Sequence, residues 1–277
     1  MRDKIAVSGH AGRTISVLRP GQGKQERRKE TMKRCFAVMA AALVVCAALP
    51  ASAQYFTEDF EAGIGLWTPG SNGPLLWQTD VTDPNNKVAV QDNAARSMYR
   101  IIAPTIHVGL ELRFRFYDPG AATNVRHFAR LAAYSDPVNF GGLTELLAIG
   151  AYNTSGVQTN MYSGRAAFGK TDTPQGWFTI PKPRSVGWHT MKITVTGGNG
   201  TGGAGKGLAS YTVDDVTVEN IPIVWSPFTM VLLGSNLSSA TAGNYQYDDV
   251  QLIPEPASIL ALAAGLAGFA GMVRRRS

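Results

Sequence analysis

Residues 109–120 read GLELRFRFYDPG, and this stretch decides the fold class. Apolar side chains alternate with charged ones along it, and the chain then runs into Asp118-Pro119-Gly120. Alternation with a period of two is the pattern of a strand with one buried face and one solvent face, and Asp-Pro-Gly is typical of a turn. The stretch therefore predicts an antiparallel strand whose outer face carries Arg113 and Arg115.

Further strands are predicted after it at short intervals. They are Phe128–Tyr134, Leu146–Tyr152, Trp177–Ile180, Trp188–Val195, Thr229–Leu233 and Tyr245–Leu252. Gly, Pro, Asn and Asp separate them, and no segment between residues 54 and 253 keeps a helical period. Many short strands between turn residues predict an all-β fold, an antiparallel β-sandwich of jelly-roll type that forms one domain over residues 54–253.

Two pairs of segments indicate which kind of sandwich this is. WHTMKITVTG (188–197) is followed after a loop by YTVDDVTVEN (211–220), and FTEDFEAG (56–63) opens the domain that YQYDDVQL (245–252) closes. They resemble the strand, loop and hairpin, and the opening and closing strands, of concanavalin-like and laminin-G-like jelly rolls. The resemblance implies that the first and last strands of the domain pair.

The net charge of +6 and the isoelectric point near 9.4 describe the ends of the chain, not its middle. Residues 1–53 and 254–277 together hold 13 of the 26 Lys and Arg but only 4 of the 20 Asp and Glu. The remaining 13 basic and 16 acidic residues leave the domain at −3, with its basic residues scattered. Because phosphate recognition starts from a concentrated basic footprint, we expect no nucleic-acid partner.

Residues 32–53 have the features of a secretory signal peptide. Two basic residues precede an apolar run from Phe36 to Leu49, and Ala51-Ser52-Ala53 places small residues where signal peptidase needs them. We therefore predict export by the Sec machinery and cleavage between Ala53 and Gln54. A transmembrane anchor is the alternative, but the run is short and no cluster of charges follows it.

Residues 1–31 are polar and charged, unlike the compact leader that normally precedes such an apolar run. We interpret them as a disordered extension from a start codon placed too early, with Met32 as the true start. Cys35 and Cys46 both lie in the segment predicted to be removed, so the exported domain should contain no disulfide and no cysteine-bound metal. A lipoprotein role for Cys46 is an alternative that the bulky Val45 disfavours.

The C-terminal residues 254–277 have three parts. Pro254-Glu255-Pro256 is a stiff extended segment, because each proline fixes its own φ and biases the preceding residue away from helix. The 17 uncharged residues from Ala257 to Val273 predict a lean, glycine-rich transmembrane helix of about 26 Å. The cluster Arg274, Arg275 and Arg276 should stay cytoplasmic and stop transfer, which leaves the tripeptide just outside the membrane.

This order of tripeptide, helix and arginines resembles the PEP-CTERM sorting signal of Gram-negative bacteria. The resemblance implies recognition by exosortase, a membrane-embedded processing enzyme that removes the helix. The precursor would reside in the inner membrane, and the processed domain would reach the cell surface or the exterior, often alongside exopolysaccharide. A plain C-terminal membrane anchor is the alternative.

No stretch of residues 54–253 matches the sequence motifs of the enzyme classes that we considered. GTGGAGKG (200–207) lacks the Ser or Thr of a P-loop, and strand follows it where a phosphate-binding helix should begin. Asp215, Thr217 and Glu219 come nearest to the Glu-x-Asp-x-Glu motif of laminarinase-type glycosidases. However, Asp215 stands where the motif has Glu, and Thr217 stands where it has Asp. The three histidines of the domain, His107, His127 and His189, stand singly. We expect no catalytic residues and keep a glycosidase as the least favoured alternative.

Aromatic and acidic residues mark the possible ligand sites. All five tryptophans lie in the domain, and one or two of them could stack on a sugar, although most tryptophans in a sandwich fill its core. They are Trp67, Trp77, Trp177, Trp188 and Trp225. The pairing of the first and last strands would bring together four carboxylates, which are candidate ligands for a structural Ca²⁺, although solvated turn residues are the commoner outcome. These are Asp59, Glu61, Asp248 and Asp249.

Together these features predict a non-catalytic cell-surface or extracellular-matrix protein with a structural or adhesive role and no required cofactor. The alternative is a lectin-like module that binds exopolysaccharide. A glycosidase comes third.

Overall fold

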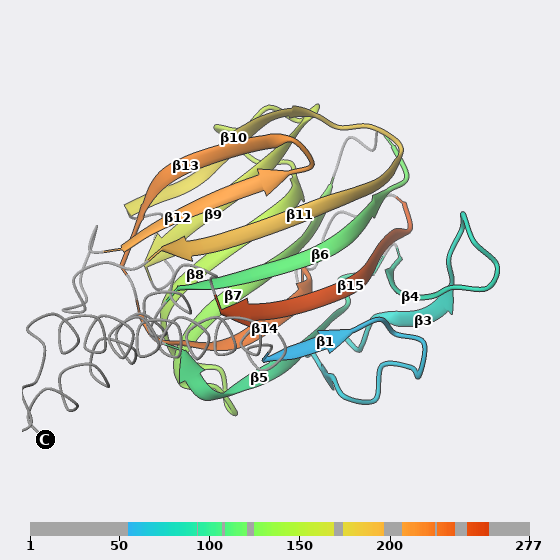
Figure 1. Cartoon of the computed structure of the whole chain (residues 1–277), viewed down its shortest axis with the longest axis horizontal. Coiled ribbons are helices and arrows are strands. Elements are labelled where there is room, and N and C mark those ends of the chain that lie inside the picture. Colours follow the sequence, from blue (N-terminus) through green and yellow to red (C-terminus); the bar gives the residue numbers. More distant parts are fainter. Residues whose placement is uncertain are drawn as a thin grey trace, which may run out of the picture. The chain divides into compact units, whose positions relative to one another are not determined.

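The computed structural model describes residues 55–92, 94–106, 109–120, 125–168, 174–196, 207–224, 226–235 and 243–254. The chain divides into residues 1–48 and 49–277, and every described residue belongs to the second unit. These residues contain strands and turns but no helix. The strands form two antiparallel sheets packed face to face (Figure 1).

Sheet A has eight strands. Its order is β13 (Val216–Ile223), β12 (Gly207–Val213), β11 (Gly187–Thr196), β6 (Leu110–Asp118), β15 (Tyr245–Pro254), β4 (Lys87–Gln91) and β3 (Leu76–Thr79), and β1 (Phe56–Glu58) also pairs with β15. Sheet B has seven strands. Its order is β10 (Pro174–Pro183), β9 (Met161–Phe168), β8 (Gly141–Tyr152), β7 (Arg126–Asp136), β14 (Phe228–Gly234), β5 (Ser97–Ile106) and β2 (Thr68–Pro69).

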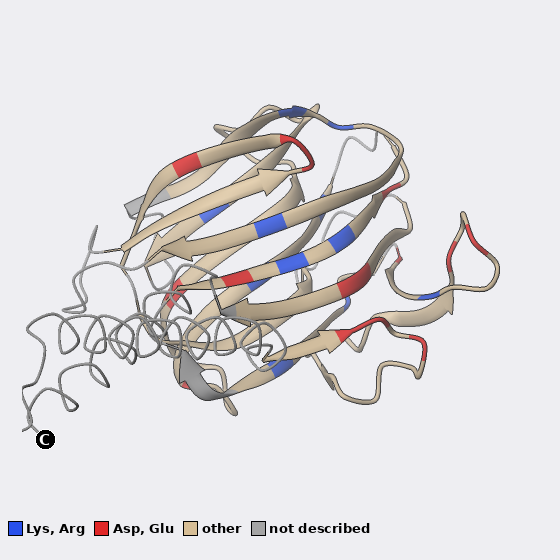
Figure 2. Ribbon diagram, viewed as in Figure 1, with Lys and Arg blue, Asp and Glu red and all other residues tan. Residues whose placement is uncertain are grey.

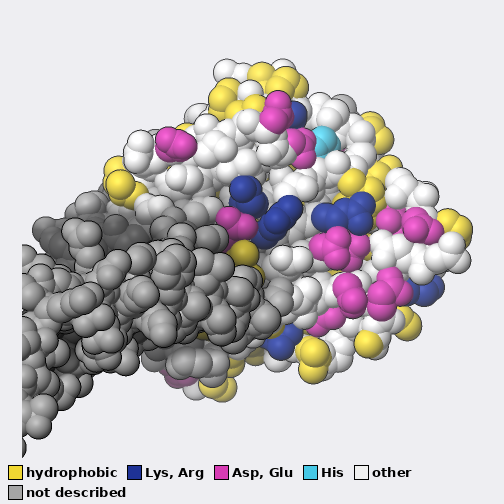
Figure 3. Space-filling view, viewed as in Figure 1, with side chains coloured by type: hydrophobic (Ala, Val, Ile, Leu, Met, Phe, Trp, Pro, Cys, Tyr) yellow, Lys and Arg dark blue, Asp and Glu magenta, His cyan; other side chains and the backbone are white. Residues whose placement is uncertain are grey.

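The predicted strands are confirmed, since each of the seven lies inside an observed strand. In β6 the apolar positions from Leu110 to Phe116 are buried, whereas Arg113 is exposed and Arg115 half-buried on the outer face of sheet A. Figure 2 shows the basic bands of β6 and β11 side by side on this face, next to acidic residues of β15, and Figure 3 shows both signs of charge interspersed over it.

The predicted pairing of the first and last strands is also confirmed. Phe56 lies opposite Leu252 and Glu58 opposite Val250, while the other edge of β15 pairs with β6. The segment 211–220 forms the expected hairpin, in which β12 and β13 pair around a turn at Asp214. The other edge of β12 pairs with β11. The predicted jelly-roll sandwich is therefore closed by strands from its two ends.

Aromatic side chains fill the space between the sheets. Phe116 of β6 packs edge-on against Tyr247 of β15 at 5.4 Å between ring centroids, and Phe114 lies 6.1 Å from the same ring. The main buried cluster draws on residues between Phe56 and Leu252. Because this core comes from the sandwich itself, we treat residues 54–254 as one folding unit.

A buried ion pair closes one end of the sandwich. The guanidinium of Arg184 donates from Nε to Asp118 Oδ2 (2.8 Å) and from Nη2 to Asp118 Oδ1 (3.0 Å) and to the hydroxyl of Tyr245 (2.7 Å). Burial alone would lower the pKa of Arg184, but the hydrogen bonds and charge of Asp118 raise it above its ordinary value. Asp118 is the first residue of the turn predicted at the end of β6.

The terminal predictions fall largely outside the described residues. Ala53 and Gln54, Glu255 and Pro256, the segment Ala257–Val273 and the arginines Arg274, Arg275 and Arg276 all lie there. Pro254 is the last residue of β15, opposite Leu110, so the final strand extends one residue past the predicted end of the domain. No helix able to cross a membrane occurs within residues 55–254 as far as the structure describes them.

Candidate functional site

An aromatic cluster lies on the outer face of sheet B. The rings of Tyr152 (β8) and Trp177 (β10) stack at 4.0 Å between centroids with an angle of 25° between planes. Phe128 (β7) packs edge-on against both, at 5.7 Å and 5.4 Å. Tyr152 and Trp177 are half-buried, so this stacked pair keeps part of its surface open to solvent.

A glycine makes room for this cluster. Gly150 of β8 lies opposite Phe128 of β7 and Ser163 of β9. A Cβ at position 150 would lie 2.6 Å from the Cα of Phe128 and 2.7 Å from its Cβ, closer than real Cβ atoms approach. The close approach of β7 and β8 therefore requires glycine here, and it leaves free space above the sheet for the large rings.

Three arginines lie over these rings. Arg126 stands over Tyr152 at 5.8 Å from guanidinium carbon to ring centroid, Arg130 over Phe128 at 5.5 Å, and Arg165 over Trp177 at 5.5 Å. Such contacts are favourable because the face of an aromatic ring is electron-rich. We call these six residues the aromatic–arginine face.

The strand register explains why the six residues meet. Trp177, Arg165, Ala148 and Arg130 lie directly opposite one another on β10, β9, β8 and β7 and form one row across sheet B. A hollow of about 280 Å³ lies at this row. Besides five residues of the aromatic–arginine face, it is lined by Leu146, Ala148, Thr154 and Ser235.

The face is positively charged. Burial, together with the nearby charge of Arg165, lowers the pKa of Arg130 to about 10, so it still carries its proton at neutral pH. Arg130 Nη2 donates to the carbonyl oxygen of Gly234 (3.0 Å), but Nε of Arg130 and Nε of Arg126 are buried without a partner. Within the described residues no carboxylate pairs with Arg126 or Arg130 and none lines the hollow.

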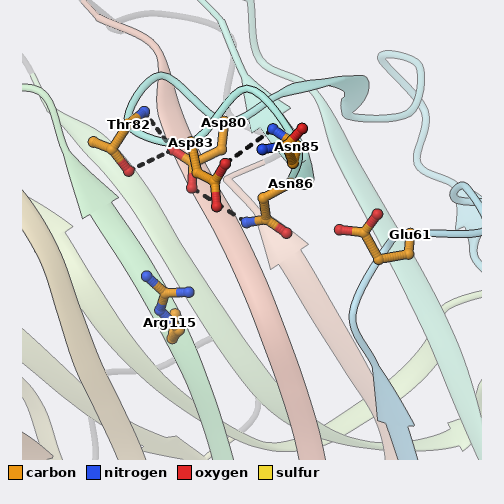
Figure 4. A pocket seen from close by; sticks show the side chains of 7 residues that line it. All are labelled: Glu61, Asp80, Thr82, Asp83, Asn85, Asn86 and Arg115. Atoms are coloured by element: carbon orange, nitrogen blue, oxygen red, sulfur yellow. Dashed lines mark hydrogen bonds between the residues drawn. The ribbon is translucent and has the colours of Figure 1, made fainter.

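A second hollow, of about 350 Å³, lies at sheet A below the loop between β3 and β4 (Figure 4). Asp80 Oδ1 accepts from the backbone N–H (2.7 Å) and hydroxyl (2.9 Å) of Thr82, and its Oδ2 accepts from the amide of Asn86 (3.2 Å). Burial would raise the pKa of Asp80, but these hydrogen bonds lower it below its ordinary value. The polar groups thus largely satisfy one another and build the loop.

The four carboxylates considered as calcium ligands are not grouped as a metal site. Asp59 accepts from the backbone N–H of Glu61, and Glu61 accepts from that of Lys87. Asp248 accepts from the amide of Asn86 (3.0 Å), and its Oδ2 lies 3.5 Å from Arg115, which is also 3.7 Å from Asp249. No three His, Cys, Asp or Glu side chains in the described part of the chain are grouped as a metal ion requires.

The tryptophans have different surroundings. Trp67 is buried in the core and donates to Glu58, Trp77 is 48% exposed on β3, and Trp188 lies under Arg115. Trp225 lies outside the described residues. Only Trp177 among the four described belongs to the aromatic–arginine face, and the sequence alone could not single it out.

His189 belongs to an arrangement that the sequence did not suggest. Its Nδ1 lies 2.7 Å from Asp214 Oδ2, and its Nε2 lies 3.3 Å from the Ser185 hydroxyl, which is the order of a Ser-His-Asp triad. However, Nε2 is closer to the carbonyl oxygen of Ser185, at 2.9 Å. A nitrogen that donates to a carbonyl cannot accept the hydroxyl proton, so we interpret His189 as a link between two loops.

The other suspected chemical residues lie apart from both hollows. Asp215 pairs with Lys182 at 2.6 Å, Thr217 bonds the hydroxyl of Thr212, and Glu219 is on the same β13 hairpin. His127 is buried in the core, and His107 lies outside the described residues. Residues 200–206 of the glycine-rich loop also lie outside them, and Gly207 begins β12, which confirms the predicted strand there.

The fold is similar to that of known two-sheet domains. The globular domain of T. cruzi calreticulin superposes with a TM-score of 0.52 at 12% identity, over 80% of this chain and 99% of that one. Carbohydrate esterase vb_24B_21 of the Shiga toxin-encoding bacteriophage phi24B gives 0.48 at 11% identity over 73% and 99% of the two chains. The CBM2 module of the evolved Dit of Lactobacillus casei BL23 phage J-1 gives 0.47 at 12% identity over 72% and 94%.

At these sequence identities the similarity concerns the fold alone. The superposition on the calreticulin domain is the comparison that supports it. The sequence matches no protein-family model and no curated protein. The fold and the site therefore define a two-sheet jelly roll with an aromatic and basic face on one of its sheets.

Proposed function

We propose that residues 54–253 form an exported, non-catalytic glycan-binding module whose ligand stacks on the aromatic–arginine face. The observation that carries the proposal is the stacked pair Tyr152 and Trp177 beside a hollow of about 280 Å³. The C–H groups of a pyranose ring present an apolar surface, and half-exposed aromatic rings provide a matching one. Arg130 and Thr154 line the same hollow with hydrogen-bonding groups for sugar hydroxyls.

Binding fits this hollow better than cleavage. Glycoside hydrolysis uses two carboxyl groups placed on either side of the scissile bond, and no carboxylate among the described residues lines the hollow. A structural or adhesive role in a matrix is compatible with the same proposal, because a matrix protein must hold a component of that matrix.

We further propose that the protein is exported, sorted as a PEP-CTERM substrate and released or anchored at the cell surface. The support is the sequence: a signal peptide at residues 32–53, and Pro254-Glu255-Pro256 ahead of an apolar segment and three arginines. A module delivered in this way would meet the exopolysaccharide of its own cell, which makes that polymer the first ligand to test.

The test is a binding measurement on residues 54–254 with purified exopolysaccharide from the producing strain. We expect binding that quenches tryptophan fluorescence and that Trp177→Ala or Tyr152→Ala reduces at least about tenfold, since each removes much of the stacking surface. Trp77→Ala on sheet A is the matched control and should bind as the parent does. If neither aromatic change weakens binding while both variants keep the parent's melting temperature, the site is wrong.

A further inference from the structure

We infer that the glycan bound by the aromatic–arginine face is acidic, with uronate carboxylates paired to Arg126, Arg130 and Arg165. This inference rests on the proposed function, since it names the chemical class of the ligand for the same site.

The first support is the placement of the guanidinium groups. Arg130 and Arg165 occupy the same row of sheet B with only Ala148 between them, so their backbones lie about 9.6 Å apart, two strand spacings. Ala148 has a short side chain, which leaves the space between the two arginines open as part of the hollow. Two cationic side chains therefore line the same hollow.

The second support is that the arginines are held in place before any ligand binds. Each guanidinium lies 5.5–5.8 Å from the centroid of an aromatic ring, and Arg130 is further fixed by its bond to the carbonyl of Gly234. A planar guanidinium that is already oriented loses little freedom when it forms paired hydrogen bonds to a carboxylate. The rings and the guanidinium groups lie on one face of sheet B, so one ligand can contact both kinds of group.

The third support is an uncompensated charge. Arg130 lies within range of the charge of Arg165. Within the described residues neither Arg126 nor Arg130 has a carboxylate partner, and the buried Nε of each has no acceptor there. Like charges that share a low-dielectric surface repel one another, and this arrangement is unfavourable without an anion. A carboxylate-bearing sugar would provide the negative charge.

The opposite sheet offers a contrast. On the outer face of sheet A, Arg113 also lies opposite another basic residue, Lys192, but it is exposed and acidic residues lie among the basic ones (Figures 2 and 3). No aromatic ring lies under Arg113 in the described structure. A change at Arg113 therefore alters net charge as a change at Arg126 does, without touching the proposed site.

The experiment compares three forms of one polymer on residues 54–254: polygalacturonate, its methyl ester and its carboxyl-reduced form. We expect polygalacturonate to bind at least about tenfold more tightly than the two neutral forms, the difference that one or two charge-assisted hydrogen bonds make. Arg126→Gln and Arg130→Gln should each reduce that preference, and Arg113→Gln should leave it intact. Raised salt should weaken only the acidic polymer.

The outcomes separate the two proposals. Equal binding of all three forms with loss in Trp177→Ala would overturn the inference and leave the glycan-binding function standing. Failure to bind any of these polymers or the strain's own exopolysaccharide would overturn both. Equally tight binding of dextran sulfate or polyphosphate, which carry no carboxylate, would show a general anion site and would also overturn the carboxylate assignment. If Arg130→Gln fails to fold, the binding preference of Arg126→Gln and the salt dependence of the parent still test whether the site recognises carboxylates.

Discussion

His127 lies between the sheets, where its ring stacks on that of Tyr245 at 3.7 Å with 19° between the planes. Both ring nitrogens are buried and have no hydrogen-bond partner among the described residues. Burial, and to a smaller extent the charge of Arg184, lowers the pKa of His127 to about 3. The residue therefore acts as a neutral aromatic ring in the folded protein.

This histidine should make the fold sensitive to acid. In the unfolded chain His127 is protonated below about pH 6.5. In the folded protein it stays neutral until the pH falls to about 3. Its contribution to stability is complete above pH 6.5 and falls by about 1.4 kcal/mol per pH unit between those values. Thermal unfolding of the parent and His127→Phe at pH 7.5, 5.5 and 4.5 checks this, because the variant should lose less stability. Parallel losses in the two proteins would contradict the assignment.

The ion pair of Asp118 and Arg184 makes a second prediction for a single residue. Their side chains are 0% and 7% exposed, so Asp118→Asn leaves a cation buried without its counter-charge. We expect a loss of about 3–5 kcal/mol in the free energy of unfolding, measured in urea. Asp215→Asn, which removes the exposed partner of Lys182, is the control and should have little effect. Similar losses in both variants would show that burial of the pair is unimportant.

At the scale of strands, the sequence indicated some elements and could not indicate others. The strict alternation of β6 identifies a strand with one buried face. The hairpin at 211–220 is predicted from the resemblance of this segment to those of jelly rolls. β9 reads MYSGRAAF and β4 reads KVAVQ; both are buried on consecutive positions, so they carry no period of two. Burial by neighbouring strands, which no local pattern records, makes them strands.

The aromatic–arginine face was hidden from the sequence for a related reason. Its six residues come from four strands between positions 126 and 177, and they meet only because the order β10, β9, β8, β7 sets Trp177, Arg165 and Arg130 in one row. The sequence could name Trp177 as one of five candidate tryptophans. It could not show that arginines lie over the rings, because that depends on register.

Gly150 gives a prediction at this scale, because it controls the distance between β7 and β8. In Gly150→Ala the new methyl group would meet the backbone of Phe128, which cannot move without separating the two strands. We expect a loss of about 3 kcal/mol, measured by urea denaturation, together with weaker glycan binding. Gly65→Ala, where the added atom meets nothing within 4 Å, should match the parent in both measurements. An unchanged midpoint for Gly150→Ala would refute the close approach.

For the whole molecule, the proposed sorting signal can be tested apart from the domain. Glu255→Ala should leave folding and export unchanged but leave uncut precursor in the inner membrane, because the tripeptide would be read by the processing enzyme. Mass spectrometry of the surface form, in strains with and without that enzyme, reports the cut. Ser277 retained at the surface would refute processing, and a plain anchor predicts no effect of Glu255→Ala.

The position of β15 also determines how the molecule would respond to tension. β15 is hydrogen-bonded along one edge to β6 and along the other to β4 and then β1, so it lies inside sheet A and not at its border. A pull on the chain at Pro254, directed along the strand, would load these two rows of hydrogen bonds in shear and at the same time. Strands loaded in that way resist until many bonds fail together, whereas a border strand peels one bond at a time. A module held by its C-terminal end in flowing water would therefore keep its fold under load.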